Sequence, residues 1–395
     1  MFYSRKIYSS LKAHLARKQI TVLTGMRRVG KTTLVKQLLS EVQSENKIYF
    51  DLERLDHREL FAEKNYETII LALEQRGLDL KQKLYLAIDE MQLAPNLPSV
   101  LKYLYENYPI KFIITGSSSF YLKNLFSESL AGRKKIFELF PLDFGEFLTF
   151  NAVPFKKNAP KEWRCQFQKT EYARLKGYYE EYINFGGFPE VALAKNQNEK
   201  KDLLADIISS YINIDVAALA DFRYQKDFYA LIKTLAARTG SRLDYAKLSR
   251  LTGIARPTLT NYLEFLEKTY LISRLPVFAK SPDREIVKAR KLYFCDTGLL
   301  RQLAEVSSGA QFENAVFNQL RQGQDELRYY ARKSGQEIDF ILGRALAVEV
   351  KETPLDSDSK TLQSLCAKLK IKKQCLIGRY PSPQFNQYLW GGELR

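Results

Sequence analysis

The sequence predicts an α/β protein whose first domain is a parallel sheet covered by helices. Apolar strands alternate with amphipathic segments from residue 20 to 141, which is the pattern of such a sheet. A glycine-rich loop follows the first of these strands. The chain has 395 residues, more than one core of ordinary size holds, so further domains are expected. Hydrophobic residues at 45% and charged residues at 27% indicate a folded globular protein.

Five strands and four helical segments make up the predicted first domain. The expected strands are Ile20–Thr24, Lys47–Leu52, Leu84–Asp89, Lys111–Thr115 and Ile136–Phe140. The expected helices are Thr32–Val42, Asp56–Gln75, Ser99–Asn107 and Phe120–Leu130. In this layered arrangement a ligand binds at the carboxyl ends of the strands.

The loop from Gly25 to Thr32 fits the phosphate-binding pattern G-x-x-x-x-G-K-[ST] without a mismatch. Its glycines let the backbone N–H groups point at phosphate oxygens, and the helix that follows adds its positive end. Lys31 is expected to contact the β- and γ-phosphates, and the Thr32 hydroxyl to ligate Mg²⁺. The alternative is a plain strand-to-helix turn. We expect ATP and Mg²⁺ here, with contacts from Gly25, Arg28, Val29, Gly30, Lys31, Thr32 and Thr33.

An acidic pair, Asp89 and Glu90, follows the third strand. Taken alone, such a pair is usually a solvated strand end. The phosphate-binding loop upstream favours another interpretation, in which Asp89 coordinates the metal and Glu90 is the general base for the attacking water.

Two further residues are candidates for the same chemistry. Ser117, or Thr115 beside it, could sense the γ-phosphate if the strand before it neighbours the acidic strand; a serine-rich helix cap is the alternative. Arg133 precedes the last strand and could reach a nucleotide in a neighbouring subunit, or it could be an ordinary surface arginine. The predicted catalytic set is Lys31, Glu90, Ser117 and Arg133.

The middle of the chain reads as helical, with a break at Gly186–Pro189, and then as three helices followed by a short hairpin over residues 231–295. This is the element order of a winged helix. Arg256, Thr258 and Asn261 lie outward at the start of the third helix, where a recognition helix contacts DNA. Acidic residues further along that helix leave a protein-docking role open.

The last part of the chain contains Asp339 and then Glu349-Val350-Lys351, the D…(D/E)-x-K pattern of metal-dependent nucleases. The period of two in the strand 346–351 puts Glu349 and Lys351 on one face, and Asp339 is within cross-strand reach. A nuclease would hold Mg²⁺ with Asp339 and Glu349, orient water with Lys351 and complete the metal shell with Glu313. The alternatives are a charged cross-strand cluster, or a nuclease fold kept for binding or assembly.

The composition narrows the choice of partners and compartment. A net charge of +16 predicts attraction to polyanions such as nucleic acid or anionic lipid. No apolar run is long enough to span a bilayer, so we expect a soluble cytoplasmic protein without a membrane partner. Four scattered cysteines and two histidines argue against structural zinc, a disulfide framework and histidine-based catalysis.

Six stretches together resemble a known group. They are Gly-Met-Arg-Arg-Val-Gly-Lys-Thr-Thr, Ile-Asp-Glu-Met-Gln, Ile-Thr-Gly-Ser-Ser-Ser, Leu-Ala-Gly-Arg, Gly-Gly-Phe-Pro-Glu and Tyr-Phe-Cys-Asp-Thr-Gly-Leu. The chain is similar to bacterial and archaeal AAA+-type ATPases with a C-terminal domain of unknown function. The resemblance implies an AAA+-like core, a winged helix and a PD-(D/E)XK nuclease-like domain.

We expect the ATPase core at residues 1–145, a helical connector at 146–230, the winged helix at 231–300 and the nuclease-like domain at 301–395. The leading hypothesis is an oligomeric ATPase that binds or acts on duplex or branched DNA. A nucleotide-switched regulator or scaffold and an ATP-gated nuclease are the alternatives.

Overall fold

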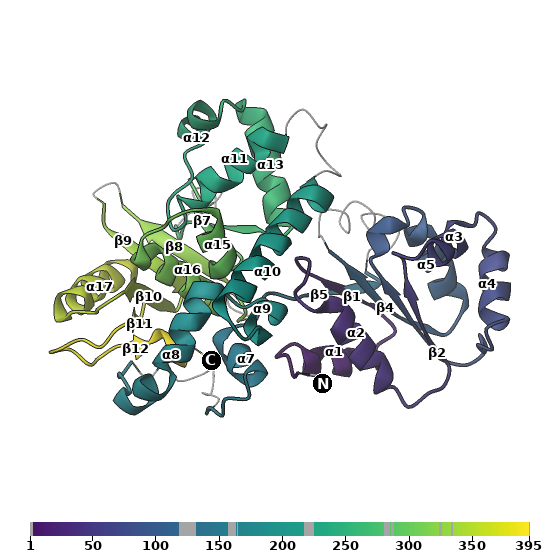
Figure 1. The fold of residues 1–395 in the computed structure, drawn as a ribbon. Coiled ribbons are helices and arrows are strands. Elements are labelled where there is room, and N and C mark those ends of the chain that lie inside the picture. Colours follow the sequence, from purple (N-terminus) through teal and green to yellow (C-terminus); the bar gives the residue numbers. More distant parts are fainter. Residues whose placement is uncertain are drawn as a thin grey trace. The chain divides into compact units, whose positions relative to one another are not determined.

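The protein is described here by a computed structural model, which covers residues 3–117, 132–156, 163, 165–216, 225–279, 285, 288–323, 326–332 and 335–394. The chain divides into two compact units (Figure 1). Unit 1 comprises Met1–Phe140 with Lys268–Tyr270, and unit 2 comprises Pro141–Glu267 with Leu271–Arg395. The four-part division expected from the sequence stays a prediction, since its last three parts fall mostly in unit 2.

Unit 1 is a parallel five-stranded sheet with the strand order β2-β3-β4-β1-β5. The strands are β1 Ile20–Thr24, β2 Lys47–Asp51, β3 Leu84–Asp89, β4 Ile110–Gly116 and β5 Lys134–Glu138. The α/β class and the parallel sheet are therefore confirmed. Because β4 lies between β1 and β3, the residues after β4 lie between the loop after β1 and the acidic end of β3.

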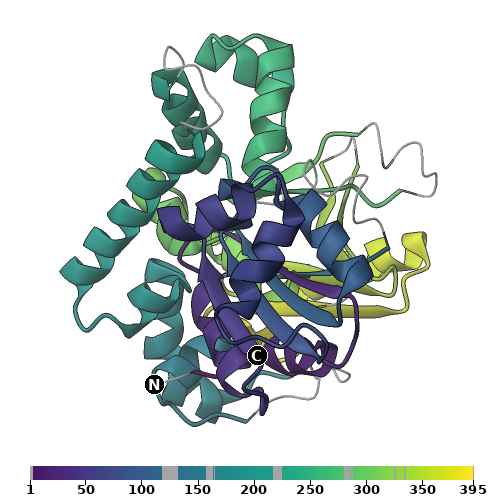
Figure 2. The same ribbon diagram turned by 90° about the vertical axis from the view of Figure 1, so that its right-hand side faces the viewer.

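The described helical elements of unit 1 are α1 Tyr8–His14, α2 Lys31–Ser40, α3 Leu55–Ala62, α4 Tyr66–Glu74, the 3₁₀ turn η1 Met91–Leu93 and α5 Leu97–Asn107. Helices α3, α4 and α5, at the right of Figure 1, lie in front of the strands of unit 1 in Figure 2. The single helix predicted over Asp56–Gln75 is wrong: the chain forms two helices, and the Asn65 side chain caps the second by accepting from the Glu67 N–H. The helix predicted over Phe120–Leu130 lies outside the described residues.

Unit 2 begins with helices. They are α7 Phe144–Phe150, α8 Lys169–Phe185, α9 Pro189–Leu193, α10 Gln197–Ser210 with the π-helical turn η2 Tyr211–Val216, α11 Gln225–Ala236, α12 Tyr245–Thr252 and α13 Arg256–Lys268. The antiparallel strands β6 Ile272–Leu275 and β7 Lys291–Phe294 follow. The three helices and the hairpin predicted for this region are present, and their interpretation as a winged helix stays a prediction.

A second five-stranded sheet, of order β12-β11-β10-β9-β8, ends the chain. Its elements are α15 Thr297–Leu303, α16 Ser308–Leu320, β8 Leu327–Ala331, β9 Glu337–Leu342, β10 Leu346–Lys351, α17 Asp356–Leu369, β11 Lys373–Gly378, β12 Leu389–Trp390 and the 3₁₀ turn η4 Gly391–Glu393. Strands β8, β9 and β10 pair antiparallel, and β10, β11 and β12 pair parallel. The predicted hairpin of Asp339 and Glu349 is thus found.

Two of the quoted sequence motifs meet in the interior of unit 2. The Asp296 carboxylate accepts from the N–H groups of Gly298 and Leu299 at the start of α15, and from the Gly187 N–H at 2.7 Å. A Cβ at Gly186, whose φ is +77°, would overlap that carboxylate. Burial raises the pKa of Asp296 to about 6, although the three N–H groups oppose the shift.

Cysteine pairing differs from the expectation. Cys165 and Cys375, which are 210 residues apart, form a disulfide with their Cα atoms 5.8 Å apart, whereas Cys295 and Cys366 are free and buried. No local pattern indicates this pair, because the two residues meet only through the tertiary fold. Within the described part of the chain, every helix is too short or too polar to cross a membrane.

Candidate nucleotide site and acidic cluster

The loop between β1 and α2 has the shape that phosphate binding requires. Gly30 is in the left-handed region at φ +98° and is the N-cap residue of α2, so no side chain caps the helix. The first-turn N–H groups of a helix lack acceptors within the helix and attract anions. A Cβ at Gly25 would overlap the carbonyl oxygen of Leu139, which explains a glycine there. Val29 is buried, while Arg28 and Thr33 are exposed.

Lys31 lies at the mouth of this loop. Its ammonium donates to the carbonyl oxygens of Gly25 and Met26, both at 2.9 Å, and its side chain is buried. The carbonyl contacts hold the ammonium against the turn of the loop. Phosphate oxygens are stronger acceptors than carbonyl oxygens. The Lys31 ammonium can therefore leave these two backbone carbonyls and contact a bound phosphate instead.

The buried Asp89 carboxylate is surrounded by neutral hydroxyls. Thr32 donates to Oδ2 at 2.6 Å, Tyr49 donates to the same oxygen at 2.7 Å, and Thr115 donates to Oδ1. Burial, and then the bond to Asp89, raises the pKa of Tyr49. The sequence predicted that Thr32 and Asp89 ligate one Mg²⁺, and the structure brings the two side chains into contact. It did not predict Tyr49, whose only signal was its place near the end of the neighbouring strand.

Glu90 lies between β3 and the residues that follow β4. Its backbone is left-handed at φ +56°, and its N–H donates to the Thr115 hydroxyl at 3.1 Å. The Gln92 amide donates to the Glu90 carboxylate and, at 3.0 Å, to the buried Ser117 hydroxyl. Strands β3 and β4 are neighbours, as the prediction for Ser117 required. Gln92, quoted in a motif but given no role, is the residue that connects Glu90 with Ser117.

Arg5 supports the loop from the start of the chain. Its guanidinium donates to the carbonyl oxygens of Val29 at 2.9 Å and Phe140 at 2.7 Å, and its side chain is buried. Nothing in the local pattern of Arg5 distinguishes it from other basic residues near the amino terminus, so the sequence does not predict this supporting role.

Arg133 lies away from these groups. It precedes β5, its carbonyl accepts from the N–H of Ile20 at the start of β1, and its guanidinium pairs with Glu106 at 2.7 Å. The phosphate-binding loop follows the other end of β1. Within one chain the structure therefore does not bring Arg133 to the predicted site, and its role in a neighbouring subunit stays a prediction.

Two of the four residues predicted for the nuclease-like site, Glu313 and Asp339, meet at a lysine that was not predicted, together with Glu337, which was not predicted either. Lys291 of β7 contacts Glu313, Glu337 and Asp339, while Lys351 pairs with Glu349 at 2.8 Å. Burial, and then the Asp339 charge, raises the pKa of Glu313 to about 7 and that of Glu349 to about 8. Burial opposes the charge on Lys291, yet the three carboxylates raise its pKa above the usual value.

The predicted recognition helix exposes part of its predicted face. Arg256 and Asn261 are exposed and Thr258 is half-buried, while Leu259, Leu263 and Leu266 are buried. The geometry is compatible with a surface contact, and the contact itself is untested.

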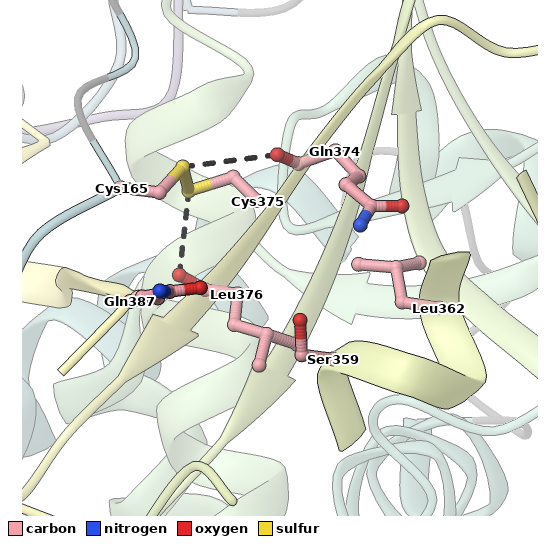
Figure 3. Close-up of a pocket in the computed structure, with 7 residues that line it drawn as sticks. All are labelled: Cys165, Ser359, Leu362, Gln374, Cys375, Leu376 and Gln387. Carbon is pink, nitrogen blue, oxygen red and sulfur yellow. Dashed lines mark hydrogen bonds between the residues drawn. A yellow bond between two sulfur atoms is a disulfide. The ribbon is translucent and has the colours of Figure 1, made fainter. Parts of the chain in front are cut away.

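A pocket of about 190 Å³ lies in unit 2 beside the disulfide (Figure 3). Its lining residues are Cys165, Ser359, Leu362, Gln374, Cys375, Leu376 and Gln387. Pockets for cofactor-sized ligands usually measure about 300–1,000 Å³. This pocket is smaller and has no charged side chain in its lining, so it does not suit a nucleotide.

Three regions match known protein families. Residues 17–148 match the family described as AAA domain. Residues 176–310 and 308–385 match families described as Domain of unknown function (DUF8612) and Domain of unknown function (DUF4143). The AAA part of the resemblance is confirmed over the region that contains the phosphate-binding loop; the winged-helix and nuclease-like parts stay predictions.

Similar proteins span both units. An uncharacterized protein of Methanocaldococcus jannaschii is 28% identical over 93% of this chain and 83% of its own length. An uncharacterized protein of Haemophilus influenzae is 28% identical over 91% and 89%. Among solved structures, the Walker-type ATPase of Pyrococcus abyssi covers 76% of this chain and 96% of its own, with 18% identity and a TM-score of 0.48.

Proposed function

We propose that unit 1 binds ATP with Mg²⁺ and hydrolyses it. The match of residues 17–148 to the AAA domain family supports nucleotide binding. The single observation that carries the proposal is the 2.6 Å contact between the Thr32 hydroxyl and the buried Asp89 carboxylate, directly after a phosphate-binding loop. Mg²⁺ prefers oxygen ligands of these two kinds.

Different residues of the loop contact the phosphates and the metal ion in this proposal. Lys31 neutralises the β- and γ-phosphates, and the backbone between Gly25 and Thr33, including Arg28, Val29 and Gly30, surrounds the phosphate oxygens. Thr32 and Asp89 are the residues that would hold Mg²⁺, which supplies charge neutralisation on the phosphates.

The acidic strand end supplies the reaction chemistry. Glu90 is placed to accept a proton from the attacking water, because it follows directly on the metal-binding Asp89. Ser117 is positioned after β4 to respond to the γ-phosphate, and Gln92 connects it with Glu90. Gln92 is a positioning residue in this proposal, because it acts through Glu90.

Calorimetry on the full chain tests the binding step. With Mg²⁺ present, the parent should bind ATP and Lys31→Ala should bind it at least tenfold more weakly, because the charge on the phosphates is lost. Lys102→Ala, an exposed change on α5, is the matched control and should bind like the parent. Equal affinity of Lys31→Ala and the parent would overturn the proposal.

DNA is the second partner that we propose, with a homo-oligomer as the working form. The support is the net charge of +16 and the exposed Arg256 and Asn261 at the start of α13. Arg133 would act on the nucleotide of a neighbouring subunit. With 6–10 phosphate contacts, DNA affinity should fall roughly a thousandfold or more between 50 and 200 mM salt.

Fluorescence anisotropy with duplex, single-stranded and branched DNA tests this partner. Arg256→Ala should weaken binding, and the exposed Lys373→Ala is the matched control. Absence of binding to all three DNAs at low salt would overturn the DNA proposal. A chain that also stays monomeric with ATP would then favour the nucleotide-switched regulator.

A further inference from the structure

Lys291 is held rigidly in the acidic cluster of unit 2. It is the first residue of β7, where it pairs with Leu275 of β6 and forms a bridge with Arg242. Two residues later, the Tyr293 ring stacks on Phe317 of α16 with 4.3 Å between ring centroids. These contacts fix the strand, so the side chain of Lys291 reaches the carboxylates without freedom to move away.

The ammonium of Lys291 contacts three carboxylates. Glu313 of α16 lies 3.0 Å from it and Asp339 of β9 lies 3.2 Å from it, and Glu337 of β9 makes the third contact. A lysine ammonium has three N–H donors, which equals the number of carboxylates that it contacts. Its side chain is 3% exposed. It is therefore a buried, desolvated cation.

Two further donors contact the Asp339 and Glu313 carboxylates. The Val350 N–H donates to the second oxygen of Asp339 at 2.9 Å, and the Tyr293 hydroxyl donates to Glu313 at 2.6 Å. Among the residues that the structure describes, no group of three His, Cys, Asp or Glu side chains is arranged to hold a metal ion. Three carboxylates, those of Glu313, Glu337 and Asp339, contact Lys291.

We propose that Lys291 is the resident cation of this cluster and takes the place that a divalent metal ion would otherwise occupy. A divalent ion held by Asp339 needs the oxygens that Lys291 and the Val350 N–H already contact, and it would be repelled by an ammonium at contact distance. The D…(D/E)-x-K pattern of Asp339, Glu349 and Lys351 thus belongs to a site that already contains two cations of the chain, Lys291 and Lys351. This inference does not depend on ATP hydrolysis in unit 1.

Counting bound Mn²⁺ by electron paramagnetic resonance, on the full chain without nucleotide, tests it. All proteins carry Asp89→Asn, which removes the proposed metal ligand of unit 1 from the count. We expect no Mn²⁺ that depends on Asp339 in this background. Adding Lys291→Ala should create a site for about one Mn²⁺ per chain. Adding Asp339→Asn to that variant should abolish the new site.

The exposed Lys373→Ala is the control for the loss of one positive charge, and it should add no Mn²⁺ site. A folded Lys291→Ala variant that gains no Mn²⁺ would overturn the proposal. If Lys291→Ala does not fold, the proposal is still tested by comparing Mn²⁺ uptake of the Asp89→Asn protein with that of the Asp89→Asn protein that also carries Asp339→Asn. Equal Mn²⁺ uptake by those two proteins supports the proposal, and loss of uptake with Asp339→Asn overturns it.

Discussion

The two units contain carboxylates in opposite surroundings. In unit 1, Asp89 accepts from the hydroxyls of Thr32, Tyr49 and Thr115, all of which are neutral. In unit 2, Glu313 and Asp339 contact the ammonium of Lys291. Hydroxyls orient a carboxylate without cancelling its charge, whereas an ammonium cancels it. An incoming cation would meet neutral hydroxyls in the first arrangement and an ammonium in the second.

Two acidic sequence motifs that both predict a metal site therefore differ in whether a cation of the chain already contacts their carboxylates. Both the acidic pair after β3 and the D…(D/E)-x-K pattern place carboxylates at a strand end or on a strand face. Only the cation supplied by another part of the fold distinguishes them. A short acidic motif is therefore informative about metal binding once the charges that face it from other elements are known.

The largest effect is expected at Glu90. Glu90→Gln keeps the shape and the contact with Gln92 but removes the base, so kcat for ATP should fall by about 10²–10⁴-fold while ATP binding is kept. Steady-state ATPase assays with calorimetric binding check this. An unchanged kcat would show that Glu90 is not the base.

The buried lysine of unit 2 gives the next largest effect. Lys291→Met leaves three carboxylates without their cation, and removing one partner of a buried ionic group costs about 3–5 kcal/mol. The two tryptophans of the chain, Trp163 and Trp390, both belong to unit 2, so denaturant unfolding followed by their fluorescence reports on this unit. The exposed Lys373→Met should change the free energy of unfolding by less than about 0.5 kcal/mol. Equal effects of the two changes would contradict the role of Lys291.

Local pattern was sufficient for much of unit 1. The strands before the glycine loop and before Asp89 were predicted at their observed bounds, because each is an apolar run that ends in a distinctive polar motif. The strand expected at Ile136–Phe140 begins two residues earlier, at Lys134, since pairing with Ile20 sets its register. The motifs predicted Thr32 and Asp89 as ligands of one metal ion but not the direct hydrogen bond between them.

What the sequence did not predict are contacts between residues distant in the chain. Arg5 supports Val29, Cys165 joins Cys375, and Lys291 enters the cluster of Asp339. None of these partners has a local pattern, because each is chosen by packing between elements. The pattern predicted Asp339 and Glu313 for this cluster, but neither Glu337 nor the lysine that all three contact.

Asp296 is a third kind of carboxylate: among the described residues its hydrogen-bond donors are three backbone N–H groups and no cation. Its pKa is raised to about 6 from an ordinary value of 3.8, so the folded state binds its proton more tightly than the unfolded state. Its contribution to stability is full below pH 3.8 and is lost as the pH rises through about 6.

The matched variant is Asp296→Asn, which does not titrate. Between pH 3.5 and pH 7.5 the free energy of unfolding of the parent should fall by about 2–3 kcal/mol more than that of Asp296→Asn. Denaturant unfolding followed by tryptophan fluorescence at both pH values measures this difference. A difference that is the same at both pH values would show that Asp296 titrates in the ordinary range. The three N–H groups would then hold its charge as well as hydroxyls hold that of Asp89.

The smallest effect is expected at Gln92, the neutral contact of Glu90. Gln92→Ala removes one hydrogen bond of about 1 kcal/mol from the proposed base, so kcat should fall roughly fivefold with KM unchanged. A merely structural role would lower kcat equally in any background. In Glu90→Gln, whose base is already gone, Gln92→Ala should have almost no further effect on kcat, because both changes act through one group. If the losses in kcat are additive, Gln92 does not act through Glu90. It would then act through another contact, for instance its hydrogen bond to Ser117, the residue proposed to respond to the γ-phosphate.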